Sequence, residues 1–247
     1  MYQLEVIAFN IQSCLIAEKA GANRIELCDN PGEGGTTPSY GMIKTARENT
    51  SIQIFPIIRP RGGDFLYNDE EFTIMLRDVG LCKELGCDGV VVGMLKEDGT
   101  VDVEKTTLLV EAAYPMGVTF HRAFDRVYDH RKGLEDVIRT GCERILTSGL
   151  QPTVTEGAET LKELVDQADG RIIIMPGSGL RSTNLAEIAQ QTGATEFHSS
   201  ARKQIASAMS YQSPRMGEQL LQVILDEEEV RQMKLILQQL PQQTSTD

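Results

Sequence analysis

The 247-residue chain lacks any long hydrophobic run and is poor in basic residues. No stretch approaches the roughly 18 consecutive apolar residues of a membrane span, so we expect no membrane partner. The N-terminus shows no basic segment followed by an apolar one, which argues against a secretory signal. The 24 lysines and arginines are outnumbered by 36 acidic residues, which gives a net charge of −12. This charge disfavours nucleic acids and anionic membranes as partners, because their phosphates repel such a chain.

Common metal and nucleotide motifs are also missing. No C-x-x-C, H-x-x-x-H or H-E-x-x-H occurs, so a structural zinc site is not expected. No dinucleotide glycine fingerprint follows the first apolar run, so no nucleotide cofactor is expected either. The five cysteines, an odd number without close pairing, suit a reducing cytoplasm better than a disulfide framework.

What the sequence does contain is a repeated junction between a helix and a strand. The four copies are GANRIEL from Gly21, GCDGVVV from Gly86, GCERILT from Gly141 and GATEFHS from Gly193. In each, an amphipathic stretch ends at a glycine suited to a left-handed helix cap, and a short β-prone run follows. Four further apolar runs, LEVIA, IQIFPII, GVTFH and RIIIMPG, lie between these junctions.

Eight strands therefore alternate with eight predicted helices. The helices are expected at about Ile11–Ala20, Tyr40–Glu48, Asp69–Leu85, Val103–Ala113, Lys132–Thr140, Glu156–Ala168, Ser182–Gln191 and Glu227–Leu240. Such alternation predicts a parallel sheet, and eight units in ~250 residues match a closed (β/α)8 barrel of the TIM type. An open doubly wound sheet is the alternative, which the missing dinucleotide fingerprint disfavours.

No linker divides the chain, so residues 1–247 are expected to form a single α/β domain. A long loop, Ala201–Leu225, is predicted between the eighth strand of the barrel and the last helix. This loop could serve as a lid or an interface element.

Titratable residues occur where the predicted strands end, as in VTFHRAFD from Val118 to Asp125. The carboxyl ends of barrel strands carry the reactive groups of TIM-barrel enzymes. Because side chains alternate along a strand, three carboxylates and two imidazoles are predicted to point into the barrel. They are Glu5, Glu26, Glu196, His121 and His198. Buried carboxylates need partners, which would be either a ligand or an internal salt-bridge network with Arg24 or Arg144.

His121 is the strongest candidate for acid–base catalysis, because an imidazole titrates near neutrality. Glu26 or Asp125 is expected to be the carboxylate that orients it. His198, at the end of the last barrel strand, is a further catalytic candidate.

An anion site is predicted at the end of the seventh and eighth strands. In MPGSGL, Gly177, Ser178 and Gly179 precede a helix and could turn backbone N–H groups toward an anion. Ser199 and Ser200 add hydroxyl groups, and the loops after strands seven and eight are the usual phosphate cradle of barrels. An ordinary tight turn at the two glycines is the alternative.

Other donors follow other strands. In RPRGGDF, Arg59 and Arg61 offer forked donors suited to carboxylate or phosphate, and the two glycines present Asp64. Arg122 and the pair Thr147-Ser148 add further donors. Together these residues favour a small anionic molecule as partner. Because no nucleophile is evident among them, these residues indicate a lyase or isomerase that acts on a small phosphorylated or carboxylated metabolite.

Seven of the motifs occur in an order that resembles the CutC family of copper homeostasis proteins. They are RIELC, GEGGTTPS, IIRPRGGDF, VTFHRAFD, RILTSG, GSGL and EFHSS, and they span roughly Leu4 to Arg202. The resemblance implies a TIM-type barrel, a cytoplasmic location, a homo-oligomer (dimer or tetramer) and copper ion binding. Cys14 and Cys28 resemble cysteines seen in the family, and their sulfurs are the ligand type that Cu(I) prefers. The sequence therefore leaves two alternative functions, copper handling and catalysis by a lyase or isomerase.

Overall fold

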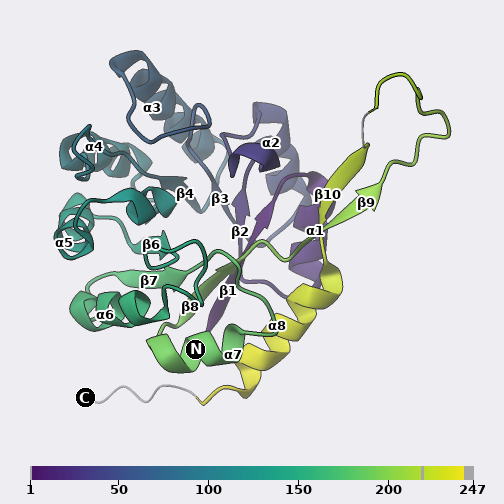
Figure 1. Ribbon diagram of the computed structural model, residues 1–247. Coiled ribbons are helices and arrows are strands. Elements are labelled where there is room, and N and C mark those ends of the chain that lie inside the picture. Colours follow the sequence, from purple (N-terminus) through teal and green to yellow (C-terminus); the bar gives the residue numbers. More distant parts are fainter. Residues whose placement is uncertain (1, 218–219, 242–247) are drawn as a thin grey trace.

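The structure is a computed structural model that describes residues 2–217 and 220–241. Strands alternate with helices in the order that the sequence predicts (Figure 1). The barrel strands are β1 (Gln3–Ala8), β2 (Arg24–Leu27), β3 (Gln53–Pro56), β4 (Gly89–Val92), β5 (Gly117–Phe120), β6 (Arg144–Thr147), β7 (Ile173–Pro176) and β8 (Glu196–Ser199). The α-helices are α1 (Ile11–Lys19), α2 (Tyr40–Asn49), α3 (Asp69–Glu84), α4 (Val103–Ala113), α5 (His130–Thr140), α6 (Ala158–Ala168), α7 (Leu185–Thr192) and α8 (Glu227–Gln239). The predicted helices are confirmed to within about one turn at each end.

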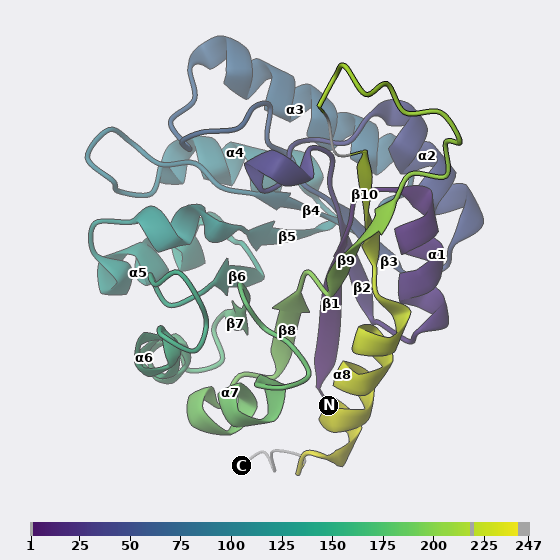
Figure 2. The same cartoon turned by 45° about the vertical axis from the view of Figure 1, so that its right-hand side comes forward.

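The eight barrel strands form two parallel sheets, with orders β3-β2-β1-β8 and β4-β5-β6-β7. The sheets join at β3 and β4, where the Asp88 N–H donates to the Ile54 carbonyl and Ile57 bridges Val91. On the far side β7 lies beside β8, although no hydrogen-bonded ladder joins these two strands in the described part of the chain. Helices surround the strands on the outside (Figure 2). The arrangement is that of a (β/α)8 barrel.

The four repeated junctions adopt the conformation that their glycines predict. Gly21, Gly86, Gly141 and Gly193 all have φ between 73° and 85°. This left-handed region is strained for residues with a Cβ, so glycine ends the helix there without that cost. The chain can then enter the next strand within a few residues, which keeps consecutive strands adjacent.

Alternation along the strands divides the apolar core into two layers. Outward-facing residues such as Leu4, Val118 and Phe120 pack against the helices in one large cluster. A smaller cluster inside the barrel contains Phe55 and Val91. The outer layer supplies most of the buried apolar surface, so the barrel interior is free to hold charged groups. None of the described helices is long and apolar enough to cross a membrane.

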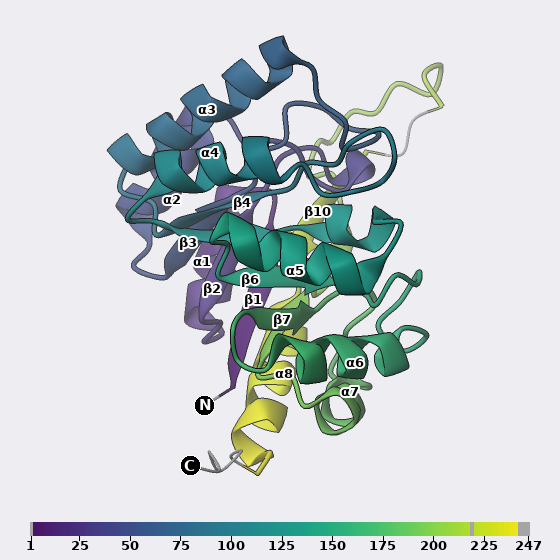
Figure 3. The ribbon, with the colours of Figure 1, turned by 90° about the vertical axis from the view of Figure 1, so that its left-hand side faces the viewer.

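The segment predicted as one long loop, Ala201–Leu225, is in part a two-stranded antiparallel ribbon of β9 (Arg202–Ala206) and β10 (Leu221–Leu225). Beyond these strands, the connecting chain projects away from the barrel (Figures 1 and 3). The ribbon is anchored beside α1, where the Leu225 N–H donates to the Ser13 hydroxyl at 3.1 Å. Its strands are mostly exposed. β9, with the sequence RKQIA, therefore lacks an apolar run like those of the barrel strands, whereas β10, LQVIL, carries one that could have been recognised.

Candidate functional site

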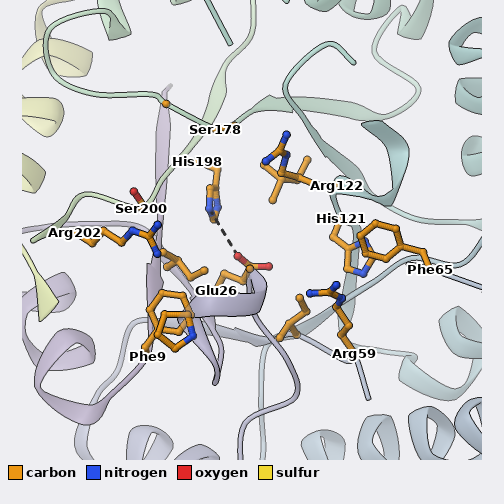
Figure 4. Close-up of a pocket in the computed structure, with 16 residues that line it drawn as sticks. Phe9, Glu26, Arg59, Phe65, His121, Arg122, Ser178, His198, Ser200 and Arg202 are labelled. Atoms are coloured by element: carbon orange, nitrogen blue, oxygen red, sulfur yellow. Dashed lines mark ion pairs between the residues drawn. The ribbon is translucent and has the colours of Figure 1, made fainter. Parts of the chain in front are cut away.

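A pocket of about 260 Å³ opens at the carboxyl ends of the barrel strands (Figure 4). It is lined by residues that follow or end β1, β2, β3, β5, β6, β7 and β8. The pocket brings together many residues that the sequence singled out. These are Glu26, Arg59, His121, Arg122, Ser178, Gly179, His198 and Ser200. The convergence follows from the barrel, which gathers the ends of parallel strands at one rim.

At the centre of the pocket, His198 lies between two buried carboxylates. Its Nδ1 atom is 2.7 Å from Oε1 of Glu5, and its Nε2 atom is 3.7 Å from Oε2 of Glu26. Candidate ligand atoms of these three residues all lie within 4.8 Å of one another. The strand order explains this grouping, because β1 stands between β2 and β8 and so places Glu5 next to both neighbours.

Below this cluster, the predicted internal salt-bridge network is confirmed. Arg24 donates from Nε to Glu5 and from Nη2 to Glu196, the latter at 2.7 Å. Arg144 donates from Nε to the same oxygen of Glu196 at 3.0 Å. The Phe55 ring lies near both guanidinium groups, 5.1 Å from Arg24 and 5.5 Å from Arg144. Glu5 and Glu196 are thus paired with cations, as buried charges require.

The pKa values of Glu5, Glu26 and His198 are shifted in different directions by their surroundings. Burial raises the pKa of Glu5, but Arg24 and the hydrogen bond with His198 outweigh it and lower the pKa to about 2. Burial raises the pKa of Glu26 to about 7, with the charge of Glu5 adding to the rise and His198 opposing it. For His198, burial disfavours the cation, yet the hydrogen bond with Glu5 and the charges of both glutamates raise its pKa. Glu26 is therefore the carboxyl group of this cluster that can exchange a proton near neutral pH.

His121 lies apart from these acids, and the structure places neither Glu26 nor Asp125 on its ring. Its Nδ1 atom accepts the Ala123 N–H at 3.2 Å, and its ring packs against Phe65. Burial, followed by the nearby charge of Arg59, lowers the pKa of His121 to about 3. The imidazole is therefore neutral at physiological pH, so it is able to donate a hydrogen bond from Nε2 but is poorly suited to proton transfer.

Asp125 organises the loops after β5 and β6 from behind the pocket. It accepts hydrogen bonds from the Thr147 hydroxyl at 2.5 Å and from the Ser148 and Leu150 N–H groups at 3.0 and 3.2 Å. It also accepts from Nε of Arg122 at 2.7 Å. Arg122 itself lines the pocket. Asp125, Thr147 and Ser148 thus hold Arg122 in position and do not line the pocket themselves.

The two arginines of RPRGGDF have different surroundings. Arg59 is buried against the pocket, whereas Arg61 pairs with Asp64 at 3.0 Å and with Glu71 at 2.6 Å. Neither Arg61 nor Asp64 lines the central pocket. Because β3 ends at Pro56, both arginines lie in the loop that follows it. The alternation of side chains along a strand therefore does not predict which of them faces the pocket.

The glycine-rich end of β7 contributes in part. Ser178, Gly179 and Ser200 line the pocket. The Gly177 N–H and the Ser199 hydroxyl instead donate to backbone carbonyls, at 3.0 and 2.7 Å. The helix α7 begins only at Leu185, so its N-terminus does not follow these glycines directly. Fewer donors face the pocket here than the motif predicts.

The two cysteines considered for copper lie in different core layers. Cys14 belongs to the outer layer and its thiol donates to the Asn10 carbonyl at 3.4 Å, while burial raises its pKa to about 12. Cys28 belongs to the inner cluster, and its thiol hydrogen-bonds Glu26. Burial, then the charge of Glu26, raises the pKa of Cys28 well above its usual value. Neither cysteine lines the pocket.

Phe65 and Arg202 are among the pocket residues that the sequence did not single out as candidates. Phe65 packs on both His121 and Arg59, with a ring-centroid distance of 4.9 Å to the first and 5.0 Å from the Cζ atom of the second. The sequence signal that could have identified Phe65 is its position as an aromatic residue at the end of the polar motif RPRGGDF. Arg202 reaches the pocket from the start of β9. Its signal was weaker, because the sequence placed it in a long loop.

Comparison with known proteins agrees with the motifs. The CutC family model matches residues 2–203. A CutC family protein of Chromobacterium violaceum is 52% identical over 214 residues, which cover 87% of each chain. The copper homeostasis protein cutC homolog of Mus musculus is 47% identical over 212 residues, which cover 86% of this chain and 78% of that one. A solved structure from Streptococcus agalactiae, described as a candidate copper homeostasis protein CutC, has a TM-score of 0.77 and 37% identity, covering 81% of this chain and 99% of that chain. The chain therefore belongs to the CutC family.

Proposed function

We propose that the chain acts in copper homeostasis by binding a copper ion at Glu26 and His198. The separation of 3.7 Å between His198 Nε2 and Glu26 Oε2 carries this proposal. It is too long for a hydrogen bond. It suits two ligands that share one ion at bond lengths of about 2.0–2.2 Å, the range known for zinc.

Glu5 supplies the support that a ligand histidine needs. A metal-binding imidazole usually donates its second N–H to a carboxylate, which holds the ring and makes it a stronger donor. Nδ1 of His198 makes this contact with Glu5 at 2.7 Å. The Nε2 lone pair is then directed toward Glu26 and the pocket. Arg24 in turn holds Glu5 in place.

The donor types bear on the oxidation state of copper. An imidazole and a carboxylate suit Cu(II), which binds such sites more tightly than the other divalent metals of its series. Cu(I) prefers sulfur, and Cys28 is the thiol that contacts Glu26. Because burial keeps this thiol protonated, it would join only when the charge of a bound ion displaces its proton. Cys14, in the outer core, is not expected to take part.

Copper titration of the metal-free protein tests the proposal. We expect one Cu(II) per chain, with affinity reduced about tenfold or more in Glu26→Gln and His198→Gln, since even outer partners of a metal site change affinity 10–100-fold. Cys14→Ser is the matched control and should bind as the wild type does. A parallel titration with Cu(I) in Cys28→Ser decides whether sulfur takes part. Equal binding by wild type and both pocket variants would refute the site.

The raised pKa of Glu26, about 7, favours a second candidate function. A carboxylate that titrates near neutral pH beside a small pocket is suited to proton transfer in a lyase or isomerase reaction. The substrate would be a small carboxylated or phosphorylated metabolite. A screen for exchange of carbon-bound protons with D2O tests this function. It predicts exchange that Glu26→Gln abolishes and that a metal chelator leaves unchanged.

The family resemblance also leads us to propose a cytoplasmic homo-oligomer. All five cysteines are free and buried, as a reducing compartment allows. Light scattering of the purified protein tests the oligomeric state, and a single species of monomer mass would contradict it.

A further inference from the structure

Arg59 is a buried cation that no carboxylate of the described residues pairs with. Its side chain donates to three backbone carbonyls: from Nη1 to Glu33 and Gly35 at 2.7 and 2.8 Å, and from Nη2 to Gly63 at 2.9 Å. The residue is only 5% exposed. Carbonyl groups hold a guanidinium but do not neutralise it, and a buried charge without a counter-charge is costly. An anion from outside the chain would remove this cost.

His121 offers an unused donor on the same side of the pocket. Because its Nδ1 accepts the Ala123 N–H, the proton of the neutral ring resides on Nε2. Nε2 is buried and has no hydrogen-bond partner among the residues that the structure describes. The edge of the ring formed by Nδ1 and Cε1 lies against Gly93, where a Cβ would approach both atoms to 2.4 Å. The ring is thus held in place while its donor is unsatisfied, which is unusual for a buried polar group.

Phe65 joins these two groups into one wall. Its ring contacts both His121 and Arg59. Figure 4 shows the three side chains together on one side of the pocket, with Glu26 and His198 nearer its centre. A ligand against this wall would meet a positive charge, an N–H donor and an aromatic ring.

We propose that the wall formed by Arg59, Phe65 and His121 binds the carboxylate of a small organic molecule. The carboxylate supplies the missing counter-charge for Arg59 and a lone pair for the Nε2–H of His121. A phosphate group fits less well, because it needs several converging donors and Arg59 has already given three of its N–H groups to carbonyls. The pocket, at about 260 Å³, is smaller than the ~300–1,000 Å³ of drug-sized sites and suits a small metabolite. This site requires neither copper nor a proton-transfer reaction, so it stands or falls separately from both proposed functions.

Two substitutions at His121 separate the donor from the structural contact. In His121→Asn, the amide oxygen can accept the Ala123 N–H in place of Nδ1, but no donor reaches the position of Nε2. In His121→Gln, the terminal NH2 can reach that position. Arg61→Gln is the control, because it removes a guanidinium from the same motif without touching the pocket.

Calorimetric titration of the chelator-treated, metal-free protein is the test, with pyruvate, malonate and succinate as carboxylate probes and inorganic phosphate as the competing class. We expect at least one carboxylate to bind one per chain, about tenfold or more weakly in His121→Asn, the effect of one hydrogen bond to a charged group. Affinity should return to within about threefold of wild type in His121→Gln, and Arg61→Gln should not change it. In the wild type, nitrogen NMR should show the His121 Nε2–H signal shifting on saturation with the probe.

Three results would overturn the proposal. They are the absence of binding by every carboxylate probe, binding of phosphate in their place, and an Nε2–H signal that does not move when a carboxylate binds. The NMR measurement decides the matter even if the His121 variants fold poorly.

Discussion

The Nε2 atom of His198 lies 3.7 Å from the Oε2 atom of Glu26, beyond hydrogen-bonding distance and within reach of a shared ion. On the other side of the imidazole, Glu5 makes a direct contact at 2.7 Å. One ring nitrogen is therefore committed to holding the ring, and the other is available. This asymmetry underlies the expectations for copper, pH and stability.

Copper affinity should rise with pH through neutrality. The ion binds the carboxylate of Glu26 and the neutral imidazole of His198, so each proton on these groups competes with it. The pKa of Glu26 is raised to about 7, and that of His198 is raised as well. Affinity should therefore increase as pH rises through about 7, with protons released on binding. Titrations in buffers of different ionisation enthalpy measure both effects, and a flat profile would contradict the assignment.

Glu26→Gln should stabilise the metal-free protein at alkaline pH. The pKa of Glu26 is about 7 in the folded chain, compared with 4.5 for a glutamate in the unfolded chain. This group therefore has no effect on stability below about pH 4.5, and the folded state loses stability as pH rises from 4.5 through about 7. We expect the variant to gain on the order of 2–3 kcal/mol at pH 8 and little at pH 4.5. Urea denaturation at both pH values measures the gain, and Glu48→Gln, on the exposed side of α2, serves as control. A variant less stable than wild type at pH 8 would be inconsistent with this account.

Arg24→Met should destabilise the barrel strongly at neutral pH. It leaves Glu5 and Glu196 without the cation that both contact, and breaking a buried ion pair from one side costs about 3–5 kcal/mol. The pKa of Glu5 is lowered to about 2, from 4.5, so its ionised form stabilises the fold above pH 4.5 and loses this effect as pH falls toward 2. The penalty of the substitution should shrink accordingly in acid. Thermal unfolding at pH 7 and pH 3 provides the comparison, and an equal loss at both would argue against the ion pair.

Gly93→Ala should damage the His121 wall with little change elsewhere. The added methyl would come within 2.4 Å of the imidazole, so the ring must move away from the Ala123 N–H. We expect carboxylate binding to fall about tenfold or more, comparable to the loss of one hydrogen bond to a charged group. Gly80→Ala is the control, because nothing lies within 4 Å of its new Cβ and it sits inside α3. Unchanged binding in Gly93→Ala would show that the position of His121 does not matter.

The fold was largely predictable because its signals are local. A glycine that accepts a left-handed conformation ends a helix wherever it occurs, and four such junctions at Gly21, Gly86, Gly141 and Gly193 define the repeat. The inward direction of Glu5, Glu26 and Glu196 followed from strand alternation alone. The ribbon of β9 and β10 was missed in part because the exposed β9 carries no apolar pattern, although β10 (LQVIL) does.

The pairing of side chains was harder, because it depends on which strands are neighbours. Glu26 was one of two carboxylates expected to orient His121, although β2 and β5 belong to different sheets. In the order β2-β1-β8 the nearer imidazole is His198, and the closed order of a barrel would have indicated it. The pKa of His121 could not be read from its residue type, since burial and the charge of Arg59 lower it to about 3. Nor does the motif RPRGGDF reveal that Arg59 faces the pocket while Arg61 faces Glu71.

The most direct test of the copper site is a crystal structure of the copper-loaded protein, with anomalous scattering recorded at the copper absorption edge. The account predicts one strong peak in the pocket, at about 2.0–2.2 Å from both His198 Nε2 and a Glu26 carboxylate oxygen. Glu5 should still contact Nδ1 of His198. A peak at Cys14, or copper bound only on the surface of the molecule, would contradict it.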